Sequence, residues 1–552
     1  MTLLPGEPDQ IGSWLHIQSP ESADFITMFS LTVRASVSVQ LMYITQKTVI
    51  GTWPERDSNP GQRGLRVECC NLLATDRKGV NGPKPHWLFG NMGSILKKDY
   101  GLRDMAINFY RNYQDKFVGF YIGLQPMLLV NDPKYLKRIF VQDFGHFVNH
   151  GFKINDGPLA RNLFEEEGDS WRIMRQGMTP MFTTGKIKNM MPLLNDCVKA
   201  YMNHIDKVIE KDELQEVKRL NNSYTFKAII ATAFGIDIDV FSGEKHKFQV
   251  MADKLLSPAL RGLASLIDSY VPGLSSKIIR LTSVELTNFF VNFTKQMVKH
   301  REGKPKQRND FMDLMIKMKN EGTVKRKNED GVSELVMTDE LIAAQAASIY
   351  VAGMETSANT MSFLLYELAL NPKIQERCYN EVKQIMEKHN GALDYESLSE
   401  LKYITMAFDE TLRKYPIAGE LLRECGKKYT FPDTDITIDK GVKLLISIYS
   451  IQHDPKYFPD PEKFDPERFA PENKDKLQEF TYLPFGEGPR NCIGEDFSIL
   501  MATCFVNFLL QALKTHQLIQ LSLQYSQKFI LNLHVKGVIT YYLQIETYMY
   551  MV

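Results

Sequence analysis

The stretch Phe485-Gly-Glu-Gly-Pro-Arg-Asn-Cys-Ile-Gly494 decides how this 552-residue chain is interpreted. It places one thiol, that of Cys492, in a loop restricted by glycine and proline, directly before an apolar run that predicts a helix from Gly494. The glycines permit backbone geometries that a side chain would forbid, so the loop could pass close under a flat cofactor and point amide N–H groups at the sulfur. Such N–H groups and the helix dipole favour an anionic sulfur. Cys492 is therefore predicted to be a metal ligand.

The pattern Phe-x-x-Gly-x-Arg-x-Cys-x-Gly resembles the haem-ligand loop of the cytochromes P450. The resemblance implies that Cys492 is the axial thiolate of haem b, iron protoporphyrin IX, and that Phe485 and Gly494 belong to the cofactor-binding loop. The alternative interpretation of Cys492 is a small buried hydrophobic residue.

Composition bounds the class of protein. The chain is 44% hydrophobic, which permits a large core, and Lys plus Arg equals Asp plus Glu at 66 each. Because the formal net charge is zero, the protein has no long-range electrostatic field that would attract nucleic acid. We therefore expect no nucleic-acid partner. Gly486-x-Gly488 matches the start of a dinucleotide fingerprint, but Asn491 stands where the third glycine should be. Nicotinamide binding within this chain is therefore not expected.

A long apolar segment without proline, Thr338 to Leu370, predicts a helix that ends before Pro372. Within it, Ala352-Gly-Met-Glu-Thr-Ser sets polar groups among apolar ones, where they would normally be costly. The segment resembles the distal-helix motif of the P450 family, which implies that Glu355 and Thr356 are catalytic and deliver protons to dioxygen. The structural alternative is that the Thr356 hydroxyl bonds to the carbonyl of Ala352, one turn back, and both interpretations can hold together.

Two further motifs precede the cysteine loop. Glu410-Thr-Leu-Arg413 places an acid and a base on one helical face, and Pro-Glu-Arg468-Phe follows downstream. Their order resembles the Glu–Arg–Arg cluster of the P450 family. The resemblance implies a structural role in which Glu410, Arg413 and Arg468 lock the segment beneath the haem, with planar guanidinium groups that lysine could not replace.

Cationic residues are also expected around the haem carboxylates. Trp171 and Arg175 lie four apart on one helical face. The pair resembles the P450 helix that binds a haem propionate, and Arg423 and Arg490 match two further propionate-binding positions. The alternative for Trp171 and Arg175 is a surface arginine packed on an indole.

We expect a mainly α fold with small β-sheets, that is, an α+β cytochrome P450 fold with a single large haem domain. Residues 77–552 form this domain in our interpretation, whereas residues 1–76 stay unassigned and contain no clear membrane anchor. The segment 117–130 predicts a hairpin, and the charged stretch 301–332 a solvated connector between helices.

The resemblance implies a haem-thiolate monooxygenase that inserts one atom of dioxygen into a small apolar substrate, a xenobiotic or a lipid-like compound. The sequence most resembles the insect microsomal detoxification branch of the family. This resemblance implies that the protein is located at the cytoplasmic face of the endoplasmic reticulum membrane, with peripheral membrane contact. Electrons would come from NADPH-cytochrome P450 reductase, with cytochrome b5 as a second candidate donor. The alternatives are a haem-thiolate isomerase or dehydratase, and a non-catalytic haem-binding protein.

Two residues depart from the family pattern. Asp496 stands where the family usually has arginine after the cysteine loop, and Trp87 occupies an expected hinge proline. A reversed charge at residue 496 is expected to weaken the packing of its helix or the docking of a redox partner.

Overall fold

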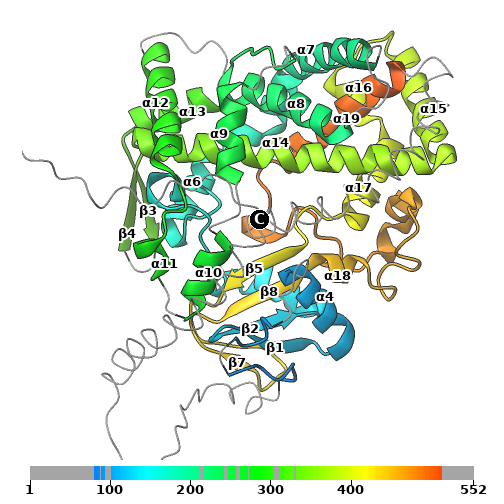
Figure 1. Cartoon of the computed structure of the whole chain (residues 1–552). Coiled ribbons are helices and arrows are strands. Elements are labelled where there is room, and N and C mark those ends of the chain that lie inside the picture. Colours follow the sequence, from blue (N-terminus) through cyan, green and yellow to red (C-terminus); the bar gives the residue numbers. More distant parts are fainter. Residues whose placement is uncertain are drawn as a thin grey trace, which may run out of the picture. The chain divides into compact units, whose positions relative to one another are not determined.

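The computed structural model describes residues 80–87, 89–93, 101–209, 216–241, 246–256, 261–270, 273–302, 310–328 and 331–512. All of them belong to one compact unit, Cys69–Val552 (Figure 1). The predicted unassigned segment 1–76 lies outside the described residues.

The described part of the chain is mainly helical, with small sheets, as predicted. Its α-helices are α4 (Leu102–Tyr113), α5 (Pro133–Lys137), α6 (Gly168–Met178), α7 (Thr184–Ile209), α8 (Val217–Ile229), α9 (Lys247–Leu256), α10 (Arg261–Tyr270), α11 (Ser275–Ile278), α12 (Val284–Arg301), α13 (Phe311–Asn320), α14 (Asp339–Leu370), α15 (Pro372–Lys388), α16 (Tyr395–Ser399), α17 (Lys402–Lys414), α18 (Ile448–Gln452) and α19 (Glu495–Ala512). Short π-helices are η3 (Arg138–Gln142) and η7 (Ile230–Phe234). Short 3-10 helices are η4 (Phe144–His146), η5 (Gly157–Ala160), η6 (Thr179–Phe182), η8 (Pro466–Phe469), η9 (Pro471–Lys476) and η10 (Gly488–Arg490).

Helix α14 confirms the long helix predicted before Asn371-Pro372. Thr338 caps its N-terminus by accepting a hydrogen bond from the N–H of Leu341 at 3.2 Å, and the chain leaves the helix at Asn371. The helix is buried along most of its length because it packs against α8, α12, α17 and α19. Figure 1 shows it running across the helical part of the unit, with α7, α8 and α19 on one side and the largest sheet on the other. The main hydrophobic core surrounds this helix.

The largest sheet has four strands in the order β1-β2-β8-β5. Strands β1 (Phe117–Ile122) and β2 (Gln125–Val130) form the predicted antiparallel hairpin, β2 pairs in parallel with β8 (Lys443–Ser447), and β8 pairs antiparallel with β5 (Glu420–Glu424). Hydrophobic clusters cover both faces of the sheet, one of them against α4. The pairing with β8 fixes Arg423 opposite Leu444, so a cation is built into the buried end of the sheet.

The prediction of a solvated connector over residues 301–332 is wrong for its described part. Residues 311–320 form α13, in which Phe311, Met312 and Met315 are buried, and β3 (Thr323–Asn328) pairs with β4 (Gly331–Val336). The alternating charges suggested solvent on all sides, but the apolar residues between them have helical spacing and face the core. The remaining two-stranded sheet joins β6 (Tyr429–Thr430) to β7 (Thr437–Ile438).

Candidate active site

The cysteine loop closes on itself through backbone hydrogen bonds. The N–H of Cys492 donates to the carbonyl of Phe485 at 2.8 Å, and the N–H of Asn491 donates to the carbonyl of Gly488 at 3.0 Å. The loop then leads into α19, whose first turn follows Gly494. The sulfur is thus held at the start of a helix, where the dipole favours negative charge.

Gly488 fixes where this loop lies. Its φ is +75°, and a Cβ atom at this position would lie 1.9 Å from the carbonyl oxygen of Phe140 in η3. The glycine was expected to allow a close approach to a cofactor. Its open side is needed for close packing against the protein's own backbone, since η10 lies on η3, while the approach of the loop to a cofactor stays a prediction.

We expect Gly488→Ala to destabilise the protein more than Gly441→Ala. Both glycines have positive φ, +75° and +89°, so both variants carry backbone strain of about 1–2 kcal/mol. Nothing lies within 4 Å of a Cβ at Gly441, whereas the one at Gly488 meets Phe140. Steric overlap should lower the free energy of unfolding of Gly488→Ala by about 1–3 kcal/mol more. Denaturant titration measures this difference, and equal losses would show that the contact with η3 is unimportant.

The thiol of Cys492 has accessible surface, yet the surrounding protein desolvates it enough to raise its pKa. The two observations agree if the sulfur faces an internal space and not bulk solvent. Burial and the carboxylate of Glu495 raise the pKa of this thiol, while the Gly494 N–H and the guanidinium of Arg175 lower it. A bound metal cation would be the largest favourable charge for the thiolate, so this sulfur suits a metal ligand.

Arg175 and Trp171, both on α6, take different partners. The guanidinium of Arg175 donates to the carbonyl and side-chain oxygens of Asn491 at 2.6 and 2.7 Å, so it ties α6 to the cysteine loop. The indole of Trp171 is buried and lies 4.4 Å under the guanidinium of Arg490. The two residues therefore both reach the cysteine loop, and neither forms the surface pair of the alternative interpretation.

Arg423 and Arg490 are buried cations without a carboxylate partner in the described part of the chain. Arg423 donates to its neighbour's carbonyl, that of Leu422, at 2.8 Å, and Arg490 donates to the carbonyls of Phe164 and Glu166. The Nε atoms of both arginines are buried and have no hydrogen-bond partner among the described residues. Burial lowers the pKa of Arg423 to about 10, and burial together with Arg423 lowers that of Arg490 to about 9.

We call this pair of guanidinium groups the arginine cradle. Two buried like charges are unfavourable unless anions join them. The two carboxylates of haem are suitable anions, and the thiol of Cys492 lies two residues beyond Arg490 on the same loop. The donor set, one thiol and two unneutralised guanidinium groups, thus fits haem.

His150 adjoins the cradle, although no sequence motif includes it. Its Nδ1 lies 3.1 Å from Nη1 of Arg490 and 3.1 Å from the carbonyl oxygen of Phe164. Burial, then Arg423 and Arg490, hold the pKa of His150 well below its usual value. A single histidine in a loop carries no periodic signal, so sequence alone could not have found it.

Glu410, Arg413 and Arg468 come together in one buried cluster. Nε and Nη2 of Arg413 donate hydrogen bonds to the two carboxylate oxygens of Glu410 at 2.7 and 2.9 Å. Both side chains have zero accessible surface. Arg468 lies 3.4 Å from the same carboxylate. Burial raises the pKa of Glu410, while Arg413 opposes this shift.

The same cluster also holds the chain that leads to the cysteine loop. Arg413 donates to the carbonyls of Gln452 and Pro461, and Glu410 accepts from the N–H of Asp465. Gln452 in turn accepts from the N–H of Leu483, two residues before Phe485. The cluster therefore holds in place the segment of chain that leads to Cys492, the candidate metal ligand.

The distal-helix candidates lie on α14. The hydroxyl of Thr356 donates to the carbonyl of Ala352 at 2.5 Å, as the structural alternative required. Glu355 forms an ion pair with Lys218 of α8 at 3.0 Å, and both side chains are largely buried. Ser357 approaches Ser498 of α19 at 3.5 Å, so α14 reaches the helix that follows the cysteine loop. Sequence analysis did not identify Lys218 as a partner of Glu355, because it lies on α8, far from Glu355 in the sequence.

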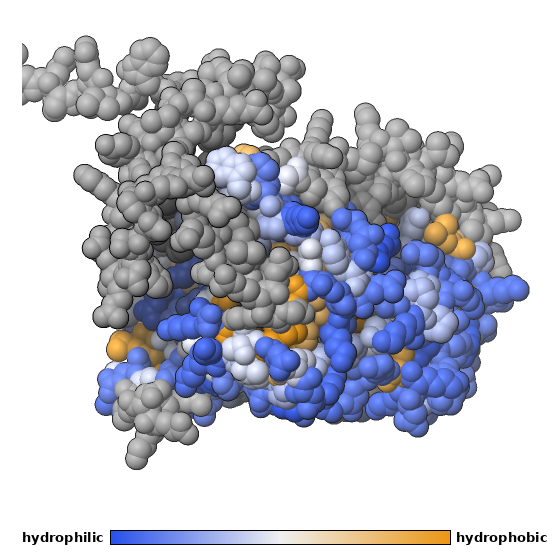
Figure 2. Space-filling model, turned by 90° about the horizontal axis from the view of Figure 1, so that it is seen from below, coloured by the Kyte–Doolittle hydropathy of each residue, from blue (hydrophilic) through white to orange (hydrophobic). Residues whose placement is uncertain are grey.

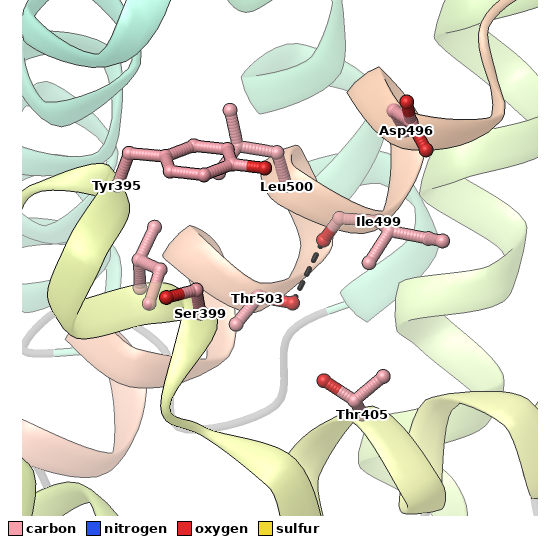
Figure 3. A pocket seen from close by; sticks show the side chains of 8 residues that line it. Tyr395, Ser399, Thr405, Asp496, Ile499, Leu500 and Thr503 are labelled. Atoms are coloured by element: carbon pink, nitrogen blue, oxygen red, sulfur yellow. Dashed lines mark hydrogen bonds between the residues drawn. The ribbon is translucent and has the colours of Figure 1, made fainter. Parts of the chain in front are cut away.

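Asp496 does not face this site. It is exposed and lines a pocket of about 170 Å³ between α16, α17 and α19, together with Tyr395, Ser399 and Thr503 (Figure 3). The carboxylate keeps its hydration, so the expected packing penalty at residue 496 does not arise. The effect on partner docking stays a prediction.

Comparison with known proteins identifies the relatives of this chain. The family model described as Cytochrome P450 matches residues 80–535. The chain is 38% identical to cytochrome P450 6B6 of Helicoverpa armigera over 439 residues, which are 79% of this chain and 86% of that protein. It is 38% identical to cytochrome P450 6B1 of Papilio polyxenes over 76% of this chain and 85% of that protein. It is 36% identical to probable cytochrome P450 6a14 of Drosophila melanogaster over 79% of this chain and 88% of that protein.

Proposed function

This chain belongs to the cytochrome P450 family, and from that premise we propose that Cys492 is the residue that holds its haem iron. The family uses haem with an axial cysteine thiolate, so the chain is a haem-thiolate monooxygenase that uses dioxygen, a substrate and a redox partner. The observation that carries the assignment is the position of the Cys492 thiol just before α19, two residues after Arg490 of the arginine cradle.

The surrounding residues would hold the cofactor by charge. Arg423 and Arg490 would bind the two propionates, and Trp171 keeps the guanidinium of Arg490 in place from below. Arg175 would act mainly through the loop, because its hydrogen bonds go to Asn491. Phe485 and Gly494 close the loop around the sulfur.

Haem with a thiolate ligand supplies the oxygen chemistry, since the thiolate favours cleavage of the O–O bond. The chain would supply the protons. Thr356 holds one proton on Oγ1, in its hydrogen bond to Ala352, and it can release that proton when the hydroxyl turns away from the helix. Glu355, the preceding residue, pairs with Lys218 and would pass on a proton from solvent for the next transfer.

The substrate and the electron donor are part of this proposal. We infer a small apolar substrate, a xenobiotic or lipid-like compound, because Thr356 lies on α14, a helix whose residues are mostly apolar. Electrons would come from NADPH-cytochrome P450 reductase, with cytochrome b5 as a second candidate donor. The redox partner would dock on the side of the cysteine loop, and Asp496, four residues after Cys492, would add an exposed negative charge in the first turn of α19.

We also infer attachment to the cytoplasmic face of the endoplasmic reticulum. Within the described residues, no helix is both long and apolar enough to cross a bilayer. Trp87, Phe89 and Leu124 expose 63%, 37% and 39% of their surface near the β1–β2 turn, which Gly90 joins by a bridge to Ile122. Figure 2, seen from the side of β1 and β2, shows hydrophobic surface within a mainly hydrophilic face. Exposed aromatic and aliphatic side chains of this kind suit peripheral membrane contact.

Reconstitution with the reductase tests the function. The protein should consume NADPH and oxygen and convert a fluorogenic alkyl ether. In Thr356→Ala, haem binding should persist, while product per NADPH falls by roughly tenfold or more and peroxide rises, because a positioned proton donor is lost.

Ser357→Ala is the matched control, since it removes the adjacent hydroxyl without touching Thr356. Unchanged coupling in Thr356→Ala would remove this residue from proton delivery. Absence of NADPH consumption with haem intact would favour an isomerase, a dehydratase or a non-catalytic protein.

A further inference from the structure

The pocket between α16, α17 and α19 takes no part in the reaction proposed above. Its volume is about 170 Å³, and its lining side chains come from residues 395–405 and 496–503 (Figure 3). Pockets that hold drug-sized ligands measure about 300–1,000 Å³, so this pocket has room for a short ligand only. The chemistry of the lining decides which kind of ligand that is.

The hydroxyl groups in the lining are left to accept hydrogen bonds. The hydroxyls of Ser399, Thr405 and Thr503 each donate to a backbone carbonyl three or four residues back, at 2.7, 2.9 and 2.8 Å. A hydroxyl has one proton, so these three oxygens can offer a ligand only lone pairs. The hydroxyl of Tyr395 can still donate. The side chains of the pocket therefore supply more acceptors than donors.

Asp496 is the charged residue of the lining, and its side chain is exposed. It lies in the first turn of α19, where the helix end carries about half a positive charge. The full negative charge of the carboxylate outweighs this partial charge. The pocket therefore favours a cation over an anion.

The rest of the lining is aliphatic or aromatic. Leu398 and Leu500 contribute aliphatic side chains, and Tyr395 contributes its ring. The ammonium of Lys188 lies 4.7 Å from the centre of that ring and pairs with the carboxylate of Glu396. An ammonium group thus already packs on one side chain of the lining, as a cation–π contact allows.

We propose that this pocket binds a short primary alkylammonium ion. An ammonium group has three N–H donors and no acceptor, which matches a carboxylate and three accepting hydroxyls. A short alkyl stem would lie along the aliphatic side chains, as the stem of a lysine lies along apolar surface while its charge stays in water. Asp496 would repel a short carboxylic acid, and an alcohol of equal length would lack the charge that attracts the ligand.

Saturation-transfer NMR with n-butylammonium tests the proposal on the reduced, carbon-monoxide-bound holoenzyme. Carbon monoxide occupies the open position of the iron, so the amine cannot bind there. The wild type should bind n-butylammonium, and Asp496→Asn should bind it roughly fivefold more weakly, which is the upper range for an exposed ion pair. Asp496→Arg, which places a cation at the pocket, should abolish binding. Ser399→Phe should also abolish it, because an exposed residue of the lining then fills the space.

Asp475→Asn is the matched control, because Asp475 is an exposed aspartate on η9, outside the lining of this pocket. It should bind n-butylammonium as the wild type does. Equal affinity in wild type and Asp496→Asn would overturn the proposal, and so would undiminished binding in Ser399→Phe or equal loss of affinity when n-butanol and n-butylammonium are compared across the variants. The red-shifted Soret band shows that each variant is folded, and its absence from the wild type would overturn the assignment of Cys492 instead.

Discussion

Replacement of Cys492 by alanine or histidine is expected to abolish the red-shifted Soret band of the reduced, carbon-monoxide-bound protein. That band reports a thiolate opposite the bound gas, and neither variant supplies a thiolate. The effect should be complete, because the loop places one sulfur at the start of α19. Difference spectra of purified wild type and variants, at equal haem content, provide the measurement.

Cys504→Ala is the control for this experiment. Cys504 is buried in α19, the helix that follows the cysteine loop. Its thiol donates a hydrogen bond to the side-chain oxygen of Asn195 at 3.3 Å. It should keep the band, with a modest loss of stability. Survival of the band in Cys492→Ala would show that another residue binds the iron.

Replacement of Glu410 by glutamine or alanine is expected to prevent stable folding or haem retention. Arg413 would be left as a cation with no accessible surface and no counterion, and breaking a buried pair in this way costs about 3–5 kcal/mol. The loss should spread to the cysteine loop, because Arg413 also holds the carbonyls of Gln452 and Pro461. Denaturant unfolding and the haem content of purified protein measure the two effects.

Glu400→Ala is the matched control on the surface. Glu400 pairs with Lys388 at 2.6 Å, and the side chains of Lys388 and Glu400 are 62% and 34% exposed, so solvent replaces the lost partner. Its stability should stay close to that of the wild type. If Glu410→Gln were equally harmless, the buried cluster would have no role in holding the cysteine loop.

The features found from sequence are those with a strong local signal. The helix α14 was predicted from a long apolar run ended by Asn371-Pro372, and the hairpin β1–β2 from β-branched and aromatic residues on both sides of a turn. The mainly α fold with small sheets followed from the same patterns. The family comparisons confirm the haem-thiolate monooxygenase that the cysteine loop implied.

The features that sequence could not supply depend on contacts between distant segments. His150 reaches Arg490 across 340 positions, and Lys218 reaches Glu355 from another helix. The prediction of a solvated connector over residues 301–332 was wrong for a different reason. The many charges of this segment hid the helical spacing of the apolar residues in α13. Charge patterning alone therefore misjudged a segment that packs into the core.

The contact between Gly488 and Phe140 bears on attempts to graft this loop elsewhere. The ten residues from 485 to 494 form a recognisable unit in sequence, yet their shape is moulded against the π-helical turn Arg138–Gln142. A transplanted loop would need that turn, or a scaffold with equal room for a carbonyl at the same spot. The portable module is therefore larger than the signature by which it is recognised.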